Sequence, residues 1–117
     1  NVVTNIPDQT EDKLSGQQQI FTTGDFSKQN MLAANLPHNH PLWRRSLHDK
    51  FGYFSDEFAS GSDWEFWLRC TFAGVEMALI KEPLGIYYQN PEGMSTKPEN
   101  MKRNLQEVMD IRKRYAT

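Results

Sequence analysis

The chain has 117 residues, enough for one domain with a single hydrophobic core. Thirteen Lys and Arg residues against fifteen Asp and Glu residues give a net charge of −2, which excludes a broadly basic surface, so no nucleic-acid partner is expected. The single cysteine, Cys70, excludes an internal disulfide, and no apolar run approaches the roughly 20 residues of a membrane span.

The first part of the chain is polar. Residues 1–19 contain a Pro, a Gly and a run of three Gln, a composition typical of a loop or linker, and no clear element starts there. We therefore expect an ordered domain over residues 20–117, in a chain that is a fragment of a longer protein. Asp25 or Thr23 is expected to cap a helix whose apolar residues include Phe26, Met31, Leu32 and Leu36 and which ends before Pro37.

Three pairs of residues have the spacing of a capping box, in which a Ser or Thr precedes an acidic residue by three positions. Ser46 and Asp49 predict a short helix that Gly52 closes, and Ser62 and Glu65 predict a second helix. Thr96 and Glu99 predict the start of a long last helix, whose apolar residues recur at helical spacing: Met101, Leu105, Val108, Ile111 and Tyr115.

The helix expected between Ser62 and Gly74 organises the rest of the chain. Its apolar residues, which are Trp64, Phe66, Trp67, Leu68, Cys70 and Phe72, leave almost no polar side, which predicts a helix buried all round. Gly74 is a natural helix end. After it, the runs Val75–Ile80 and Leu84–Tyr88 are rich in strand-forming residues and predict two strands.

Three blocks of the sequence, taken together, resemble the second half of family 2 glycosyltransferases. They are Pro41-Leu42-Trp43-Arg44-Arg45-Ser46-Leu47-His48 within residues 35–48, then Phe51-Gly52-Tyr53-Phe54-Ser55-Asp56-Glu57-Phe58, then Ser62-Asp63-Trp64-Glu65-Phe66-Trp67-Leu68-Arg69. Their order and spacing carry the resemblance, which extends over roughly residues 20–116. In the first position of the acidic pair that the family often has, this chain has Ser62, and Asp63 holds the second.

The resemblance implies an α/β fold, in which helices pack on a short mixed sheet as part of a GT-A domain. It also implies the acceptor-side half of an enzyme that transfers a sugar from a nucleotide sugar to a glycan or lipid-linked acceptor. Asp63 would be the general base that takes the proton of the attacking hydroxyl. The alternative is that Asp63 only complements the dipole of the first helical turn.

The donor side is missing from this chain. The resemblance implies a divalent metal, Mg or Mn, in the full-length parent, but no Asp-x-Asp triplet occurs here, so no metal is expected in the fragment and we expect it to be inactive alone. The histidines His38 and His40 are two residues apart with no Cys or paired carboxylate at ligand spacing, which makes them poor candidates for metal ligands.

Five further residues are candidate substrate contacts: His40, Trp43, Arg44, Trp64 and Glu65. Arg44 presents donors that fit phosphate oxygens, or it is a solvated surface residue. Trp64 is either a platform for a sugar ring or a core residue. Glu65 is either a second acid or the capping-box partner of Ser62, and we expect it to pair with Arg69 one turn later.

The remaining expectations concern partners and location. The chemistry implies a cytoplasmic protein, with peripheral contact to the inner face of a membrane through basic residues of the last helix: Lys102, Arg103, Arg112, Lys113 and Arg114. Two strands are too few for a comfortable sheet, so a homodimer that pairs open edges is expected. The rival hypothesis from another class is a non-catalytic interaction module that binds a partner through its aromatic loops.

Overall fold

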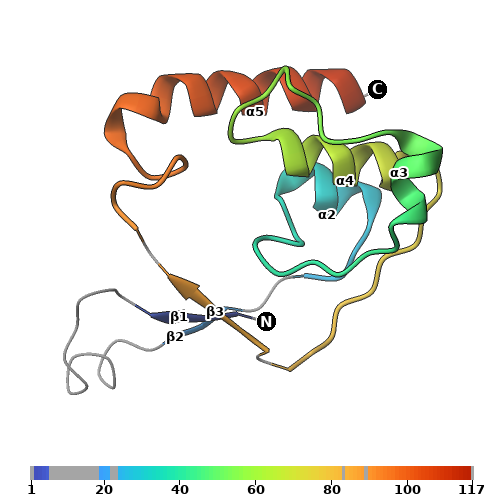
Figure 1. Ribbon diagram of the computed structural model, residues 1–117, viewed down its shortest axis with the longest axis horizontal. Coiled ribbons are helices and arrows are strands. Elements are labelled where there is room, and N and C mark those ends of the chain that lie inside the picture. Colours follow the sequence, from blue (N-terminus) through green and yellow to red (C-terminus); the bar gives the residue numbers. More distant parts are fainter. Residues whose placement is uncertain (1, 6–18, 22–23, 83, 89, 117) are drawn as a thin grey trace.

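A computed structural model describes residues 2–5, 19–21, 24–82, 84–88 and 90–116. Four α-helices in this part of the chain form a compact globule, and three short strands lie beside it (Figure 1). The helices are α2 (Lys28–Ala33), α3 (Ser46–Phe51), α4 (Ser62–Phe72) and α5 (Met101–Tyr115), and the 3-10 turn η1 (Pro98–Asn100) leads into α5.

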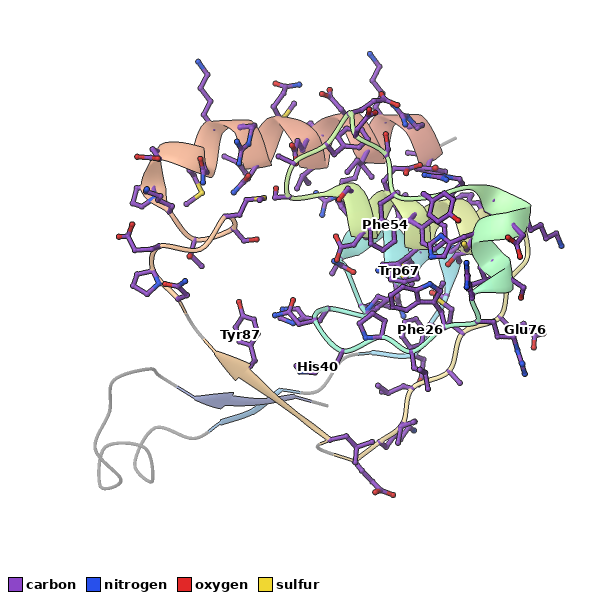
Figure 2. The ribbon with its side chains drawn as sticks, viewed as in Figure 1. Phe26, His40, Phe54, Trp67, Glu76 and Tyr87 are labelled. Atoms are coloured by element: carbon purple, nitrogen blue, oxygen red, sulfur yellow. The ribbon has the colours of Figure 1, made fainter. Side chains whose placement is uncertain are left out.

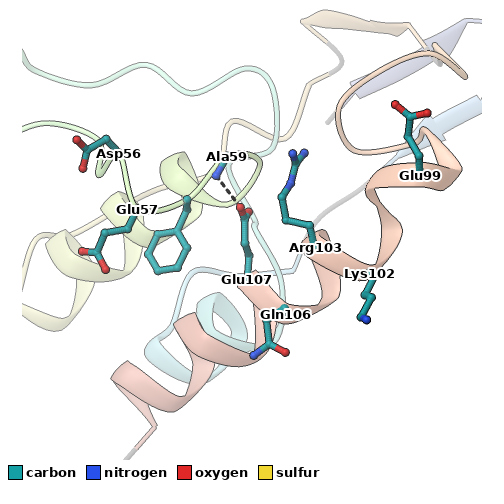
Figure 3. Close-up of a pocket in the computed structure, with 9 residues that line it drawn as sticks. Asp56, Glu57, Ala59, Glu99, Lys102, Arg103, Gln106 and Glu107 are labelled. Carbon is teal, nitrogen blue, oxygen red and sulfur yellow. Dashed lines mark hydrogen bonds between the residues drawn. The ribbon is translucent and has the colours of Figure 1, made fainter.

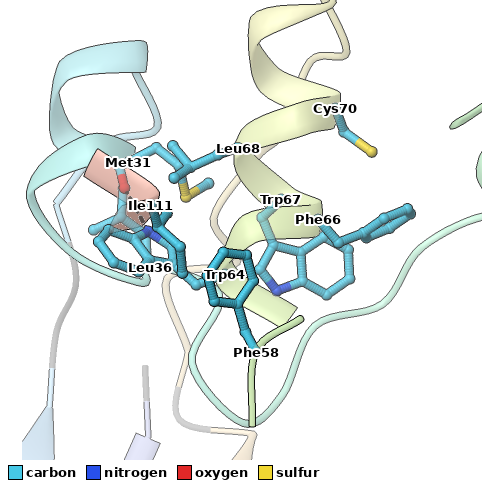
Figure 4. Close-up of a cluster of buried hydrophobic side chains, with 9 residues drawn as sticks. All are labelled: Met31, Leu36, Phe58, Trp64, Phe66, Trp67, Leu68, Cys70 and Ile111. Carbon is cyan, nitrogen blue, oxygen red and sulfur yellow. Dashed lines mark hydrogen bonds between the residues drawn. The ribbon is translucent and has the colours of Figure 1, made fainter. Parts of the chain in front are cut away.

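Helix α4 is the centre of the globule and packs against α2, α3 and α5. The prediction of a buried helix is confirmed, because six of its eleven residues are buried. Nine apolar side chains form the core (Figure 4), and they are Met31, Leu36, Phe58, Trp64, Phe66, Trp67, Leu68, Cys70 and Ile111. They come from α2, α4, α5 and the loops between them. Different sides of α4 therefore contact different neighbours.

The predicted α/β fold, with helices packed on a short mixed sheet, is wrong. Every core residue that the structure describes belongs to a helix or to a loop beside one, and the helices pack mainly on helices. The physical reason is the composition of α4: a helix that is apolar on every side needs partners all round, and α2, α3 and α5 supply them. The compact part of the molecule is therefore all-helical.

The strands form a ribbon outside the helical core (Figure 1). Strand β1 (Val2–Asn5) lies in the middle, antiparallel to β2 (Gln19–Phe21) and parallel to β3 (Gly85–Tyr88). Val3 pairs with Ile20 on one side and with Ile86 on the other. The expectation of a loop over residues 1–19 is thus wrong for Val2–Asn5 and for Gln19, which begins β2, and the rest of that prediction falls on residues 1 and 6–18, outside the described residues.

The run Val75–Ile80, predicted as a strand, pairs with no other strand among the described residues. Its backbone has no regular hydrogen-bonding pattern. The exposure of its side chains nevertheless alternates from residue to residue, as it does in a strand. The strand prediction for this run is therefore wrong: its composition favours strand, but a strand also needs a neighbour, and no described segment provides one.

The glycines end their helices as predicted. Gly74 has φ of +99°, and the amides of Gly74 and Val75 donate to the carbonyls of Thr71 and Cys70, which is a Schellman motif. Gly52 has φ of +80° and closes α3 with a bond from its amide to the His48 carbonyl. Both positions need backbone angles that glycine adopts at little cost.

None of the three predicted capping boxes forms. Helices α3 and α4 begin at Ser46 and Ser62 themselves, so these serines are the first helical residues rather than caps. The Thr96 hydroxyl turns back to the carbonyl of Asn90. At the start of α2 the cap is Ser27, whose hydroxyl accepts from the Asn30 amide, and not Asp25; Thr23 lies outside the described residues.

Candidate functional site

Asp63, the predicted base, lies in the first turn of α4 and is half-buried. Its Oδ2 accepts a hydrogen bond from Asn35 Nδ2 at 3.1 Å, and its Oδ1 accepts from the Trp64 amide at 2.7 Å. Asn35 follows α2 in the chain, so the contact joins segments 28 residues apart. No cation of the described residues forms an ion pair with Asp63, and its carboxylate keeps free lone pairs.

His38 lies close enough to Asp63 for their charges to interact. Burial lowers the pKa of His38 below its ordinary value and the charge of His40 lowers it further, while Asp63 opposes both effects. The imidazole is therefore neutral at pH 7. Its Nδ1 is buried and has no hydrogen-bond partner in the described part of the chain, and the same is true of Asn35 Oδ1.

Strand β3 closes over the turn that carries these histidines. The Tyr87 ring meets the His38 ring edge-on with centroids 4.7 Å apart. Two residues earlier, Gly85 lies under the His40 ring, so near that a Cβ there would come within 2.5 Å of His40 Cδ2. Figure 2 shows Tyr87 and His40 at the junction between the helices and β3. Tyr87 therefore forms one wall of a polar cluster made by Asn35, His38 and Asp63.

Three of the predicted substrate contacts, His40, Trp43 and Arg44, line a second feature, a cavity of about 650 Å³. Its other wall is the extended segment 75–80, and its floor includes Trp67, whose buried Nε1 has no partner among the described residues. Asp63 does not line this cavity. The structure thus brings His40, Trp43 and Arg44 together but places the predicted base in the neighbouring polar cluster.

Trp43 is held in place by histidine. Its Nε1 donates to His48 Nε2 at 3.0 Å, and His48 Nδ1 lies 3.0 Å from the Gly52 carbonyl, so both ring nitrogens have partners. The His48 ring also stacks between Tyr53 and Phe66, with centroids 4.8 and 4.9 Å away. His48 is therefore the centre of an aromatic cluster, although its place in a short helix next to exposed residues would suggest a surface position.

Two other predicted contacts are structural. Trp64 is 5% exposed and its Nε1 donates to the Met31 carbonyl at 2.8 Å (Figure 4), which leaves no free ring face for a sugar. Glu65 is 2% exposed and forms the predicted ion pair with Arg69, while Tyr115 donates to its Oε1 at 2.5 Å. For Trp64 the structure supports the core alternative. For Glu65 it supports the predicted pair with Arg69, but the capping box with Ser62 does not form.

The buried pair of Glu65 and Arg69 joins three elements. Burial works to raise the pKa of Glu65, but bonds from Arg69 and Tyr115 outweigh it and hold that pKa below its ordinary value. Burial, together with the bond to this carboxylate, raises the pKa of Tyr115 to about 12. Arg69 also donates to the carbonyls of Phe51 and Tyr53, which fixes the end of α3 to α4.

Sequence reasoning missed Glu107. From the buried face of α5 its carboxylate accepts from the amides of Ala59, Ser60 and Gly61 and from the Ser60 hydroxyl, at 2.6 to 3.0 Å. Figure 3 shows it in a surface cavity of about 670 Å³. Because this carboxylate is fully used by the loop before α4, we assign Glu107 to the fold.

Two of the five basic residues of α5 contact other parts of the fold. Arg112 donates to the carbonyls of Leu32 and Ala33, and its guanidinium lies 5.8 Å from the Trp64 ring. Arg114 bonds to Glu57 at 2.9 Å, which offsets its charge. The other three, Lys102, Arg103 and Lys113, are exposed. Within the described residues, no helix combines the length and apolar character that a membrane crossing requires.

The described residues also do not fit the divalent metal that the resemblance implies for the parent. No three His, Cys, Asp or Glu side chains among them come together as ligands. The carboxylates beside α4 are used by Arg69, Tyr115 and backbone amides, apart from Asp63. We therefore derive no step of a reaction through a metal held by these residues.

Asn35, His38 and Tyr87 complete the polar cluster, and sequence reasoning did not assign them to a substrate site. The one signal for His38 was its place in a turn directly after Pro37. Nothing in the sequence pairs Asn35 with Asp63. In comparisons with known proteins, the chain matches no protein-family model, no curated protein and no solved structure.

Proposed function

We propose that this chain carries the acceptor-binding part of a sugar transferase in which Asp63 is the general base. The donor is a nucleotide sugar, and the acceptor is a glycan or lipid-linked sugar presented in the cytoplasm, at the inner face of a membrane in the lipid-linked case. The resemblance of the three sequence blocks motivates the proposal. The helical packing adds nothing to it, so the surroundings of Asp63 supply the structural support.

One observation carries the proposal: among the acids near the start of α4, Asp63 is the one whose carboxylate is not fully occupied by ion pairs or hydrogen bonds within the fold. Glu65 is held by Arg69 and Tyr115, and Glu107 by three backbone amides. Asp63 has a neutral partner, Asn35, and a neutral neighbour, His38. A carboxylate with free lone pairs beside unpartnered polar atoms is the arrangement expected of a proton acceptor.

The proposed reaction is a direct displacement at the sugar donor. Asp63 takes the proton of an acceptor hydroxyl while that oxygen forms a bond to the anomeric carbon of the donor. The bond between the anomeric carbon and the phosphate oxygen breaks, and the nucleoside diphosphate leaves with the electron pair. The proposal assigns binding of the nucleotide to another segment of the polypeptide, and Arg44 to the edge of the donor phosphates.

The substitution Asp63→Asn tests the proposal in a polypeptide that contains this chain together with a nucleotide-binding segment. Transfer should fall on the order of 10²-fold or more because the base is lost. Binding of the donor nucleotide should stay near normal. Folding should change by under about 1 kcal/mol, because the substituted amide can still accept from Asn35 and tolerates the first turn. Release of nucleoside diphosphate measures transfer, and thermal melting measures folding.

Asp110→Asn is the matched control. Asp110 is exposed on α5 and accepts a bond from Gln106 that an Asn side chain could also accept, so both activity and melting should be unchanged. Glu65→Gln is unsuitable as a control, because it disrupts a buried ion pair. Nearly full transfer by the Asp63→Asn variant would show that Asp63 only stabilises the start of the helix.

A non-catalytic interaction module remains the second candidate, favoured by exposed aromatic side chains. Tyr53 is 67% exposed, Phe54 41% and Trp43 38%, and all three lie around His48. Exposed aromatic clusters are common at protein interfaces. The two candidates differ in what the gene encodes: a preceding segment with an Asp-x-Asp motif is expected for the enzyme and not for the module.

A further inference from the structure

The polar cluster of Asn35, His38 and Asp63 contains two atoms whose hydrogen-bonding capacity is unused. Asn35 Oδ1 and His38 Nδ1 are both buried, and neither has a partner in the described part of the chain. A buried polar atom without a partner costs about 1–3 kcal/mol, so two of them beside one carboxylate call for a physical reason. Elsewhere in the described residues, Trp67 Nε1 is the one further atom of this kind.

The backbone at His38 is a second, independent sign. Its φ is +54°, and it is the one non-glycine residue with positive φ among the described residues. A residue other than glycine in the left-handed region is uncommon, and such conformations concentrate at ligand sites. In this conformation the imidazole lies against Tyr87 and close enough to Asp63 for their charges to interact.

We infer that Asn35 and His38, together with Asp63, bind the ring hydroxyls of a neutral sugar, with one hydroxyl on the carboxylate and a neighbouring hydroxyl between the amide and the imidazole. This inference rests on the proposed function and names the groups that hold the acceptor. Asn35 is also a positioning residue, because its Nδ2 fixes the orientation of the Asp63 carboxylate.

The chemistry of the unpartnered atoms selects the ligand class. A hydroxyl both donates and accepts, so it can donate to Asn35 Oδ1 and accept from, or donate to, His38 Nδ1. A phosphate or carboxylate only accepts when ionised, leaves Asn35 Oδ1 unsatisfied and is repelled by Asp63. Since the pKa of His38 is lowered, the cluster also lacks the positive charge that an anion would need at pH 7.

Tyr87 controls access to the cluster. The two unpartnered atoms are screened from solvent, and the ring in contact with His38 is that of Tyr87 on β3. A sugar therefore reaches the imidazole when this ring moves aside. Sugar rings also stack on aromatic faces, which gives the displaced ring a second contact with the ligand.

The inference is tested by nuclear magnetic resonance on the ¹⁵N-labelled 117-residue chain, titrated with methyl glucoside and with N-acetylglucosamine. The side-chain amide of Asn35 and the ring nitrogens of His38 should shift on addition of at least one of the two sugars. Two groups are internal controls and should not move: the Asn30 side-chain amide, which donates to the Asp25 carbonyl, and the doubly bonded His48 ring.

Two variants test the same contacts by affinity. Asn35→Ala and His38→Asn should each weaken sugar binding roughly fivefold or more, the equivalent of one lost hydrogen bond. Asn is chosen at position 38 because it tolerates positive φ. Asn30→Ala is the matched control and should bind normally. Three results would overturn the inference. One is that the sugars shift only Trp43 and Arg44, and another is that neither sugar binds even at a large excess. The third is that Mn²⁺ broadens the signals of Asn35 and His38 while neither sugar affects them.

The outcome is separable from that of the proposed function. If the sugars bind at Asn35 and His38 but Asp63→Asn keeps full transfer, the site stands and the assignment of the base fails. If Asp63→Asn abolishes transfer while neither sugar moves Asn35 or His38, the base stands and the hydroxyl site fails.

Discussion

At the scale of single residues, the acids around the start of α4 differ in what their environments leave free. Glu65 and Glu107 are almost fully buried, and each is surrounded by donors that hold it ionised. Asp63 is half-buried and has one neutral side-chain partner. Of these acids, Asp63 is the one that the fold holds in place without an ion pair among the described residues, as the proposed base requires.

Glu107 gives a prediction about stability and pH. Burial works to raise its pKa, but bonds from three backbone amides and the Ser60 hydroxyl outweigh it and lower the pKa below 4.5. A group whose pKa is lowered in the folded state stabilises the fold above the unfolded pKa, and the effect is lost as the pH falls through the folded pKa. The wild-type protein should therefore lose stability below about pH 4.5.

The substitution Glu107→Gln should reduce the free energy of unfolding at pH 7 by on the order of 2 kcal/mol, because charge-assisted bonds to three amides are lost and the Gln NH₂ group faces donors. Its stability should also depend less on pH as the medium is acidified through the carboxylate range. Urea unfolding at several pH values measures both effects. Glu76→Gln, at an exposed acid, is the control and should match the wild type. If the Glu107→Gln variant lost as much stability in acid as the wild type does, the assignment of this pH dependence to Glu107 would be wrong.

At the scale of elements, the end of α4 sets the direction of the chain after the core. The Schellman motif turns the backbone at Gly74 and brings Val75 back against the hydrophobic core. From there the extended segment 75–80 forms one wall of the cavity that holds Trp43 and Arg44. The conformation of one glycine therefore links the core helix to the shape of that cavity.

Gly74→Ala measures the backbone term alone. A Cβ at this position would meet no atom within 4 Å, so only the φ of +99° is unfavourable for alanine. We expect the free energy of unfolding to fall by roughly 1–2 kcal/mol. Gly24→Ala is the control, since Gly24 lacks a positive φ and its Cβ would make an ordinary contact 3.8 Å from Asn30 Nδ2. Denaturant melts that show no difference between the two variants would contradict a strained Gly74.

Local patterns predicted the helices well and their beginnings poorly. The buried α4, the amphipathic α5 and the glycine ends depend on periodicity and backbone angles that a short window contains. The capping boxes failed because the same Ser can be a cap or the first helical residue, and neighbours decide which. In α4 the loop amides before the helix are bound by Glu107, 46 residues away from Gly61, which no local pattern reveals.

The site was predicted in part for the same reason. Asp63 is a candidate from its place in a motif and stays a prediction, whereas His40, Trp43 and Arg44 do line one cavity. Asn35 and Tyr87 come from segments on either side of α4 in the sequence, and they meet Asp63 and His38 only through the packing of α2 and β3. A site assembled from distant segments requires the fold before it can be recognised.

At the scale of the whole molecule, the helical core is complete but the surface beside it is not. Leu42 is 97% exposed, Leu84 69% and Ile80 61%, and all three line the cavity with Trp43 and Arg44. Large apolar side chains that gather at one cavity mark an interaction surface. The unpaired segment 75–80 lies in the same wall, so apolar side chains and an open backbone edge occur together there.

This surface leads us to expect self-association of the isolated chain. A second copy can cover the exposed leucines and pair with the open edge, and both contacts remove apolar surface from water, at about 25 cal/mol for each Å². In sedimentation velocity the average mass should rise with concentration. Leu42→Lys and Leu84→Lys should each shift the distribution toward monomer, because a charge on this surface is costly to bury. Leu105→Lys is the matched control: Leu105 is 58% exposed on α5, away from the cavity, and its substitution should leave the distribution unchanged. A monomer at every concentration, or an equal effect of all three substitutions, would show that this surface does not join copies of the chain.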